Sequence, residues 1–412
     1  EEVPSGVHPI ATASTSIPAF VGTAEMGPID EAKLITNWTA FQRFYGSFVD
    51  GGAVNNYLAH SVYQFFNNGG SQCYIARVVK SAVAASVSAS KGLVVGVADA
   101  TVKLKKTTFS AKTPGNWGNS LVLEVERGTN NPDTELNISI KRYRGTVNLT
   151  QVASLTGEAL TNFKDELQKI APMEAFDNLN VSDPNASNYI KNVLANKSNL
   201  ITADVNESAN EPADPATVNE LEIVTGFSGG ADGTAPAVTD YRAVMDNQLN
   251  PITDISLLAT PGVGSKEMFG SAVAYCENRH LQDIFYIGEM SGKKTTPAEA
   301  RTFRESLTKP NSFGAVYFPW IKALDISGQS SEPILLPPSG FMAGLYGRID
   351  GKRGVWKAPA GTEATVSGAV GLTENLTDVE QGQLNIDKYN VNCIRRFAAS
   401  GIVSWGARTI TP

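Results

Sequence analysis

The sequence predicts an α/β (α+β) fold, in which both ends of the chain form a core with a mixed sheet covered by helices, and a β-rich domain is inserted between them. Short apolar strands alternate with amphipathic helical segments before about residue 80 and after about residue 240, which is typical of helices covering a mostly parallel sheet. In between, Ala, Ser, Val and Thr alternate without a helical period. We therefore expect a discontinuous core domain over 1–90 and 236–412, and an inserted outer domain over 91–235.

The N-terminal segment contains a strand, helix, strand pattern. Residues 17–22 are apolar and predict a short buried strand, after which Asn37 can cap a helix that Gly46 ends. A second helix is expected from about Ala53, because apolar residues recur at spacings of three and four. The strand predicted over 73–79 completes a unit that builds a parallel or mixed sheet.

The middle of the chain has β character with two helical segments. Residues 121–126 and 136–143 predict a hairpin, because a turn rich in Gly, Asn, Pro and Asp joins them. Helices are expected near 162–170 and 185–194. The Gly- and Ala-rich segment 226–236 predicts a linker back to the core.

The alternation of helices and strands returns after this linker. The expected elements are a helix over 241–249, a strand over 255–259, a helix over 266–279, a strand over 284–287, a helix over 297–307 and a strand over 315–318. Thr377 with Glu380 forms a capping-box pattern that predicts a short helix. Two apolar strands, 391–397 and 402–405, predict a hairpin about Gly401.

The segment 344–361 is rich in glycine and predicts a backbone that turns repeatedly. Its two aromatic residues, Tyr346 and Trp356, need apolar surroundings. We expect Trp356 and Trp405 to be largely buried.

The composition limits the classes of protein to which the chain can belong. The chain has 412 residues, of which 42% are hydrophobic, enough for a sizeable core and for two or three domains. Its 34 Lys and Arg against 41 Asp and Glu give a net charge of −7, which disfavours nucleic-acid binding. No apolar run approaches the ~18 residues of a membrane-spanning helix, and residues 1–2 do not start a signal peptide. We expect a soluble, unexported chain without membrane insertion.

Three cysteines, Cys73, Cys276 and Cys393, lie far apart and without C-x-x-C spacing. This pattern predicts reduced, buried thiols and excludes a disulfide scaffold or a zinc ribbon.

Gly226-Phe-Ser-Gly-Gly230 satisfies the G-x-S-x-G pattern of a hydrolase nucleophile elbow. The elbow requires a helix directly after Ser228, whereas Ala231 to Pro236 cannot begin one promptly, and His280 is the one downstream histidine. A linker turn is the favoured interpretation, and a cryptic α/β hydrolase is kept as an alternative.

Residues 261–266 lie between a predicted strand and a predicted helix, where a phosphate-binding loop would lie. The P-loop pattern needs a glycine where Ala259 stands, and its Ser or Thr after the lysine, whereas Ser265 precedes Lys266. An ordinary strand-to-helix connection is therefore favoured over a nucleotide site.

No metal-binding spacing is present among His8, His60 and His280, and His60 is expected to be a packing or surface residue. An acidic, loop-like stretch predicts a solvated surface and lacks EF-hand spacing; it comprises Asp183, Asp204, Glu207, Glu211 and Asp214. We predict no catalytic residue, no cofactor and no metal.

Two basic clusters lie near the predicted core. Arg395-Arg396 falls on a strand, and Arg348, Lys352 and Arg353 fall in the glycine-rich segment. Solvated edge charge and ion pairing with the acidic face of a neighbouring subunit are equally favoured, since interface charges set register and partner choice.

Several ordered motifs carry a family resemblance. Residues 353–359 (RGVWKAP), 376–381 (LTDVEQ), 391–395 (VNCIR) and 401–408 (GIVSWGAR) resemble the C-terminal core of contractile tail sheath proteins. These proteins form the outer tube of contractile phage tails, R-type bacteriocins and extracellular contractile injection systems. Upstream, 1–7, 19–24 and 114–119 resemble further signatures in the family's order, and the resemblance is weakest between about 146 and 220.

The resemblance implies a structural, non-enzymatic subunit that polymerises helically around an inner tube and contracts by rigid-body rearrangement of subunits. The implied partners are copies of itself, the inner tube protein, and baseplate and terminal cap proteins, in a phage tail or tail-like particle assembled in the bacterial cytoplasm. Another phage or capsid-type structural protein remains the alternative. The candidate interface residues are Glu1, Glu2, Val3, Arg348, Arg353, Arg395, Arg396, Arg408, Thr409 and Ile410.

In the family, extended arms at both chain ends add strands to neighbouring subunits. This sequence begins at Glu1, where the family has a preceding arm, and stops at Pro412, where the family continues into a further strand and helix. We therefore expect much of the sequence that holds neighbours together to be missing from it.

Overall fold

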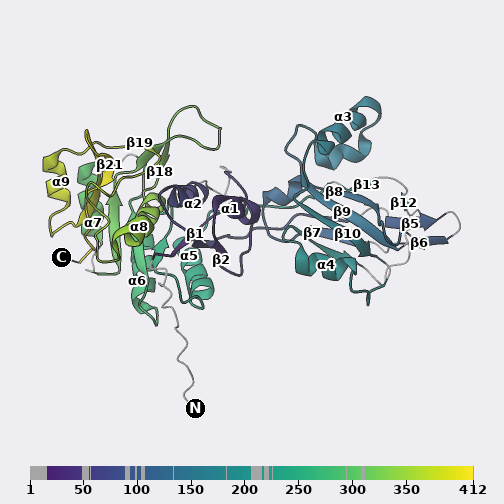
Figure 1. The fold of residues 1–412 in the computed structure, drawn as a ribbon, viewed down its shortest axis with the longest axis horizontal. Helices are drawn as coiled ribbons and strands as arrows, with labels where there is room; N and C mark the ends of the chain where they lie inside the picture. Colours follow the sequence, from purple (N-terminus) through teal and green to yellow (C-terminus); the bar gives the residue numbers. More distant parts are fainter. Residues whose placement is uncertain are drawn as a thin grey trace, which may run out of the picture.

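The structure is a computed structural model of the chain. It describes residues 16–48, 55, 57–88, 93–97, 100–103, 107–132, 134–181, 183–205, 216–217, 222–224, 226–293, 295–307 and 311–411. Figure 1 shows an elongated molecule with two bodies joined at a waist. We call them the main body, built on the largest sheet, and the middle body, built from strands between residues 86 and 224.

The main body contains an eight-stranded sheet in the order β2-β3-β1-β14-β15-β16-β20-β21. Pairing is parallel from β3 to β20, and the edge strands β2 and β21 are antiparallel to their neighbours. This confirms the predicted mixed, mostly parallel sheet. The strands are β1 (Pro18–Gly22), β2 (Lys33–Ile35), β3 (Cys73–Arg77), β14 (Leu257–Ala259), β15 (Phe285–Glu289), β16 (Gly314–Phe318), β20 (Val391–Phe397) and β21 (Gly401–Ser404).

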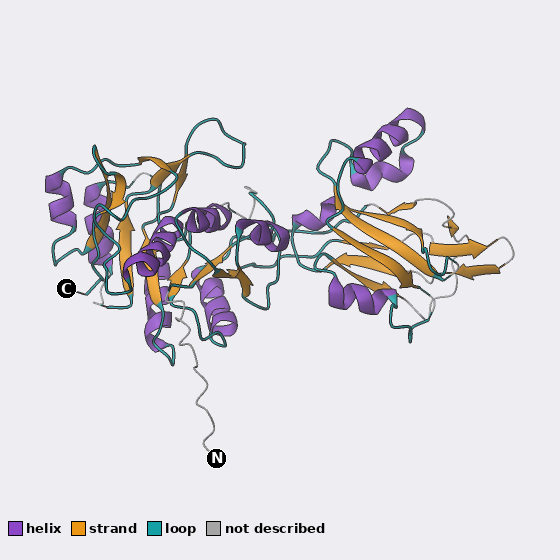
Figure 2. Ribbon diagram, in the orientation of Figure 1, coloured by secondary structure: helices purple, strands orange, loops and turns teal. Residues whose placement is uncertain are grey.

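Helices cover both faces of this sheet (Figure 2) because successive strand residues point to opposite sides. On β1, Phe20 packs in a cluster with residues of α1 (Trp38–Tyr45), α2 (Tyr57–Asn67) and α8 (Ser339–Arg353). Ala19 and Val21 pack in the opposite cluster. That second cluster contains residues from α5 (Val238–Val244), the π-helical turn Met245–Leu249, α6 (Lys266–Asn278) and α9 (Asp378–Leu384), and Ala300 of α7 (Pro297–Ser306).

The predicted helix caps are present. Asn37 accepts a hydrogen bond from the backbone N–H of Ala40, and Gly46 ends α1 at a φ of 85°. Thr377 and Glu380 form the expected capping box at the start of α9. The helix predicted from Ala53 begins at Tyr57.

The glycine-rich segment was expected to turn repeatedly, and this prediction is wrong for its first part. Residues 339–353 form one continuous helix, α8, which ends at Gly354. Its glycines lie against α2: a Cβ at Gly340 would lie 2.5 Å from atoms of Ser61, and one at Gly344 would lie 2.4 Å from the carbonyl oxygen of Phe65. Glycine is therefore used here for close approach of two helices rather than for turns.

The expectation that Trp356 is buried is also wrong, because 85% of this residue is exposed. It follows the end of α8, and its ring lies over Gly354, outside the hydrophobic clusters. Trp405 is half-buried, with its ring centre 4.6 Å from that of Phe397. The buried tryptophan of the main body is Trp320, which is 3% exposed.

A small antiparallel sheet in the main body was not predicted. It consists of β17 (Ile321–Ala323), β18 (Ile334–Leu336) and β19 (Ala369–Leu372), with β17 in the centre. Its strands have three or four residues, too few for alternation to be recognised in the sequence. The three cysteines are buried and free, as expected.

The middle body contains three sheets in the orders β10-β9-β8-β13, β11-β7-β4 and β12-β5-β6. Their strands are β4 (Ser86–Ser88), β5 (Leu93–Val97), β6 (Ala100–Lys103), β7 (Thr107–Ala111), β8 (Leu121–Arg127), β9 (Glu135–Arg142), β10 (Glu174–Asn180), β11 (Ile201–Val205), β12 (Ala216–Thr217) and β13 (Glu222–Val224). Two helices, α3 (Gly157–Gln168) and α4 (Ile190–Lys197), accompany them. The predicted hairpin is present as β8 and β9.

The chain leaves and re-enters the main body along one ribbon. Val83 and Ala231 exchange two backbone hydrogen bonds, of 2.8 and 2.9 Å, and Ser86 pairs in the same way with Ser228. The segment predicted as a linker is thus held by backbone pairing. We retain as a proposal that residues near 91–235 form an inserted domain with these paired segments as its base.

Candidate subunit-interface residues

The geometry around Ser228 does not fit a hydrolase. Its backbone pairs with Ser86, and the next helix begins at Val238 rather than directly after the serine. Ser228 lines a shallow cavity of about 480 Å³ in the middle body, whereas His280 lines another of about 360 Å³ beside Arg242 and Arg279. The serine and the histidine are therefore not placed as nucleophile and base.

In the loop 261–266, a backbone N–H that would bind a nucleotide phosphate is already bonded to the carboxyl group of Glu289. Ser265 caps α6 by accepting a hydrogen bond from the N–H of Met268 at 3.1 Å. Glu289, at the end of β15, accepts hydrogen bonds from the N–H of Gly262 and, at 3.2 Å, from that of Ser339. Burial raises the pKa of Glu289 to about 7. This acidic group occupies the loop's N–H and disfavours an anion there.

Other candidate ligands lie apart. His60 is 3% exposed, and its ring centre lies 4.4 Å from that of Phe48, as expected of a packing residue. Asp204 pairs with Lys191 at 3.0 Å on the surface. His8, Glu207, Glu211 and Asp214 lie outside the described residues. Within the ranges that the structure describes, no group of three or more His, Cys, Asp or Glu could hold a metal ion, and no helix is long and apolar enough to cross a membrane.

The two arginines of α8 have different surroundings. Arg348 donates hydrogen bonds to the carbonyl oxygens of Asn68, at 3.2 Å, and Thr365, so it joins the end of α2 to the segment that borders β21. Arg353 lies 3.5 Å from Glu363, and both side chains are more than half exposed. Exposed pairs of this kind contribute little to folding, which leaves Arg353 available to a partner.

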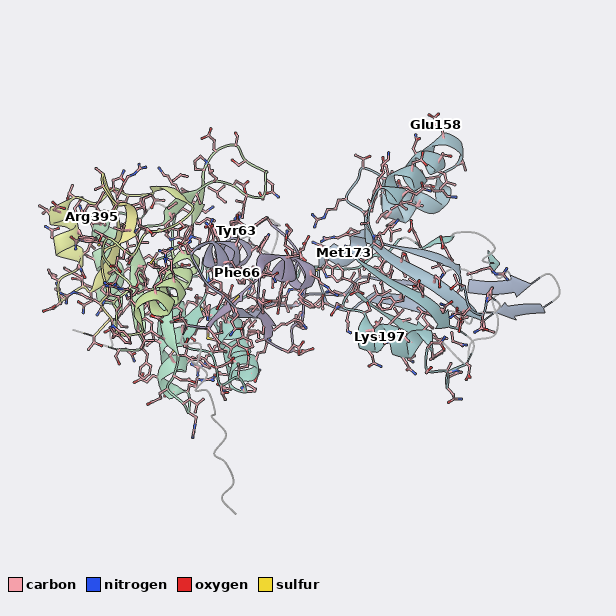
Figure 3. All side chains as sticks on the ribbon, viewed as in Figure 1. Tyr63, Phe66, Glu158, Met173, Lys197 and Arg395 are labelled. Carbon is pink, nitrogen blue, oxygen red and sulfur yellow. The ribbon has the colours of Figure 1, made fainter. Side chains whose placement is uncertain are left out.

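Arg395 and Arg396 point to opposite faces of β20. Arg395 is buried, pairs with Asp378 at 2.7 Å and donates to the carbonyl oxygen of Leu376 at 3.2 Å, so it holds the start of α9 against the strand. Arg396 is exposed. Figure 3 labels Arg395 in the main body, at the end remote from the middle body.

The last candidates follow β21. Arg408 pairs with Asp387, and its N–H donates to Asn392 at 2.8 Å. Ile410 is 2% exposed, and its N–H donates to the carbonyl oxygen of Gly314 at 3.0 Å, so this side chain is part of the chain's own core. Thr409 is half-buried between them, and residues 1–3 lie outside the described ranges. Arg353, Arg396 and Arg408 are the candidates whose charge is accessible.

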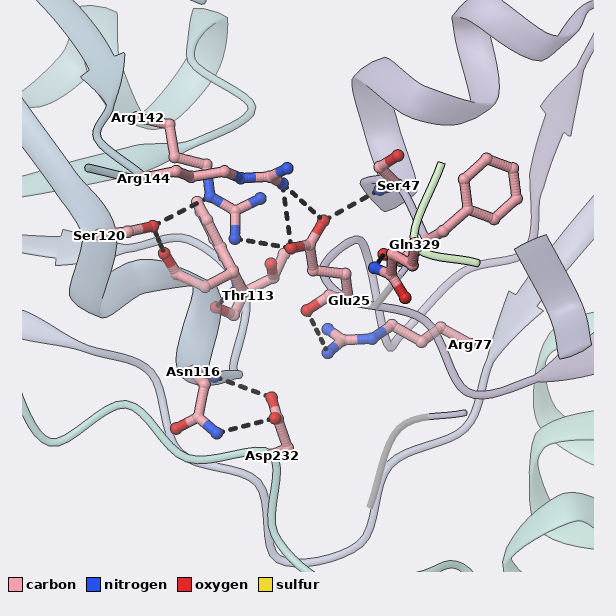
Figure 4. Close-up of polar contacts among 12 residues, drawn as sticks. Glu25, Ser47, Arg77, Thr113, Asn116, Ser120, Arg142, Arg144, Asp232 and Gln329 are labelled. Carbon is pink, nitrogen blue, oxygen red and sulfur yellow. Dashed lines mark hydrogen bonds and ion pairs between the residues drawn. The ribbon is translucent and has the colours of Figure 1, made fainter. Parts of the chain in front are cut away.

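A polar cluster at the waist was missed from the sequence. Figure 4 shows Glu25 and Arg77 of the main body beside Arg142 and Arg144 of the middle body. One signal was available: Arg77 ends an otherwise apolar strand, and a buried arginine needs partners. Nothing in the sequence placed Glu25 or Arg142 beside it.

Residues 235–410 match the family described as phage tail sheath protein central domain. The part of the chain from 235 to 410 is thus similar to the central domain of tail sheath proteins. The matched segment supplies β14 to β21 and α5 to α9, and the strands that precede it complete the same sheet through the β1–β14 pairing. Among curated protein sequences, none is a significant match to the chain.

Solved sheath tail proteins from Listeria innocua and Desulfitobacterium hafniense share the fold. A sheath tail protein from Listeria innocua has a TM-score of 0.58 at 13% identity, covering 95% of this chain and 68% of that one. A sheath tail protein from Desulfitobacterium hafniense has a TM-score of 0.54 at 13% identity, covering 96% and 72%. The helical sheath of the anti-feeding prophage in its contracted state has a TM-score of 0.47 at 17% identity, covering 99% and 66%. The chain thus spans about two thirds of the length of such sheath proteins.

Proposed function

We propose that the chain is a structural subunit of a contractile tail sheath, which polymerises helically around an inner tube and contracts by rigid-body rearrangement of its subunits. One observation carries the proposal: the family match over residues 235–410 coincides with the larger part of the main sheet, and β1 to β3 complete that sheet. The likeness therefore concerns a whole packed core rather than an isolated motif.

The accessible arginines supply a means of contact between subunits. Three exposed arginines, Arg353, Arg396 and Arg408, lie on a chain whose net charge is −7. Each copy therefore carries exposed basic side chains together with an excess of acidic ones. Ion pairs across an interface fix register and exclude wrong partners more than they add affinity. Contacts between two different faces of identical subunits generate open helical assemblies.

The packing of the main body fits movement of whole subunits. Its two hydrophobic clusters lie on opposite faces of one sheet and include residues from both parts of the chain. Such cores resist continuous deformation, so a large change in the lattice is carried by the contacts between subunits. In this proposal, the extended lattice is metastable and contraction is driven by energy stored at assembly.

The finer partners belong to the same proposal. They are the inner tube, the baseplate and the terminal cap of a phage tail or tail-like particle, assembled in the bacterial cytoplasm, with no nucleic acid, no membrane insertion and no catalysis. Neither Ser228 nor the loop 261–266 has the geometry of a catalytic or nucleotide site, which supports a non-enzymatic subunit.

Electron microscopy of the full-length gene product tests the proposal. We expect tubes of helically stacked rings from the native sequence and fewer or none from Arg396→Glu. Lys164→Glu is the matched control, since it makes the same charge change on an exposed position of α3 in the middle body. Closed shells, or no ordered assembly from the native sequence, would contradict the proposal. Esterase activity abolished by Ser228→Ala would favour the hydrolase alternative.

A further inference from the structure

A short loop of the main body enters the middle body. Residues Ala24–Gly27 follow β1, and Met26 packs, 2% exposed, among the apolar side chains beneath β8 and β9. All other described members of that cluster come from residues 85–227. The N–H of Met26 donates to the carbonyl oxygen of Tyr45 in α1, so the residue is anchored on both sides.

Glu25 bridges the two bodies with one carboxylate. It accepts from Arg142, at the end of β9, at 2.6 Å, and from Arg144 at 3.3 Å. Its other oxygen accepts from the N–H of Ser47, after α1, at 2.9 Å. The side chains of Glu25 and Arg142 are only 5% and 12% exposed, so water and salt screen this pair little. Charge-assisted hydrogen bonds of this kind are stronger and better oriented than neutral ones.

The loop is shaped around this carboxylate. Gly46 has a φ of 85°, and a Cβ there would lie 2.2 Å from Oε2 of Glu25. A side chain at position 46 would therefore exclude the carboxylate from its place beside α1.

Arg77 holds the same loop from the other side. Its guanidinium is 1% exposed and donates to the carbonyl oxygens of Ala24, at 3.1 Å, and Gly27, at 3.0 Å. It also donates to the carbonyl oxygen of Pro114, in the middle body, at 2.9 Å. Burial lowers the pKa of Arg77 to about 10, so it remains charged at neutral pH. Gly27 adds a further bond between the bodies, from its N–H to Oγ1 of Thr113 at 3.2 Å.

We propose that Ala24–Gly27 is a clasp that fixes the orientation of the middle body on the main body, with Glu25 as its positioning residue. Besides the clasp, the ribbon of 80–86 paired with 228–233 joins the two bodies, and a two-stranded ribbon can bend and twist. Neutralising Glu25 leaves the hydrophobic core of each body intact and removes the charge that holds Arg142 and Arg144 across the waist, so that only the bonds of Arg77 and Gly27 and the packing of Met26 remain in the clasp. The middle body then varies in orientation about the ribbon while both bodies stay folded.

Pulsed electron paramagnetic resonance on the whole chain tests the clasp. Nitroxide labels at Thr39→Cys on α1 and Lys197→Cys on α4 report the distance between the bodies, and the three native cysteines are buried. We expect one narrow distance distribution for the native sequence and a width about two-fold or more larger for Glu25→Gln, since bodies without a firm interface move relative to one another. Arg142→Gln should broaden the distance distribution in the same way, because it removes the partner of Glu25 in the middle body.

Glu135→Gln is the matched control. Glu135 is 6% exposed, as is Glu25, but it accepts hydrogen bonds from Asn131 and Asn188, which both belong to the middle body. It should leave the distance distribution unchanged. Equal widths in Glu25→Gln, Arg142→Gln and the native sequence would overturn the proposal. Circular dichroism that shows loss of either body's fold in both waist variants, with Glu135→Gln folded, would overturn it too, because the clasp is proposed to orient folded bodies.

Discussion

Gly344 on α8 lies directly against the backbone of Phe65 on α2, so close that a Cβ at position 344 would be 2.4 Å from the Phe65 carbonyl oxygen. Gly340, one turn earlier, makes the same approach to Ser61. The two helices thus touch through their backbones, which only glycine permits. Together they cover one face of the main sheet.

Gly344→Ala should destabilise the main body by about 1–3 kcal/mol, because the added methyl group forces apart two helices that are already in contact. Gly351→Ala is the control on the same helix: it has no neighbour within 4 Å. This change should stabilise by about 0.5–1 kcal/mol through helix propensity. Urea unfolding followed by circular dichroism measures both, and equal effects would show that the helices do not meet as described.

Glu289 should make stability fall as pH rises. The pKa of its carboxyl is raised from 4.5 to about 7 in the folded chain by burial. Between these values the unfolded chain releases the proton and the folded chain keeps it, so the free energy of unfolding decreases through this window and levels off above about pH 7. The free energy of unfolding of the native sequence, relative to that of Glu289→Gln, should fall by on the order of 3 kcal/mol from pH 4.5 to 7.

A carboxylate with the opposite shift serves as the control for this pH dependence. Hydrogen bonds from Thr296 lower the pKa of Glu299. Its contribution is therefore present above the ordinary pKa of a glutamate and is lost as pH falls. Glu299→Gln should change the pH profile in the opposite sense, and a Glu289→Gln profile parallel to that of the native sequence would refute the assignment.

Trp320→Ala should cost about 3–5 kcal/mol, because it removes a large buried side chain. Its indole N–H also donates to the carbonyl oxygen of Met290 at 2.9 Å, and that acceptor would be left unpaired. Trp356→Ala, at an 85% exposed position, should cost under about 0.5 kcal/mol. The denaturation midpoints of the two variants measure these losses of stability. A similar loss of stability in both variants would contradict the exposed position of Trp356.

Replacing residues 84–230 with a short Gly/Ser linker should leave a main body that melts cooperatively. The linker joins Val83 to Ala231, which are already paired, so loop closure costs little. Glu25 and Met26 should be changed to serine in the same variant, since both lose their partners in the middle body. Calorimetry checks the melting, and a variant that only aggregates would count against an inserted domain.

The sequence predicted the elements that short-range chemistry determines. Asn37 and Thr377 each cap a helix because the capping bonds lie within one turn. The strands of the main sheet other than β2 were also expected, because each is a short apolar run in the sequence.

What the sequence did not predict depends on residues far apart in the chain. The glycines of α8 indicated turns because the partner helix that makes them necessary lies about 280 residues away, at Phe65. The contact of Glu25 with Arg142 crosses 117 residues and has no local pattern. Arg395 was a candidate interface residue, with solvated edge charge equally favoured, whereas its burial against Asp378 and Leu376 depends on how α9 packs onto β20.

The pairing of β1 with β14 also sets an order of events during synthesis. β3 ends at Arg77 and β14 begins at Leu257, 180 residues later. At about 5–20 residues per second, the first three strands wait on the order of ten seconds or more before their central partner leaves the ribosome. By then the whole middle body has emerged with its own apolar clusters, so it can fold first. β1 can pair with β3 in the meantime, but its other edge has no partner until β14 emerges. Because β1 is apolar along its whole length, this open edge needs protection from aggregation while the chain grows.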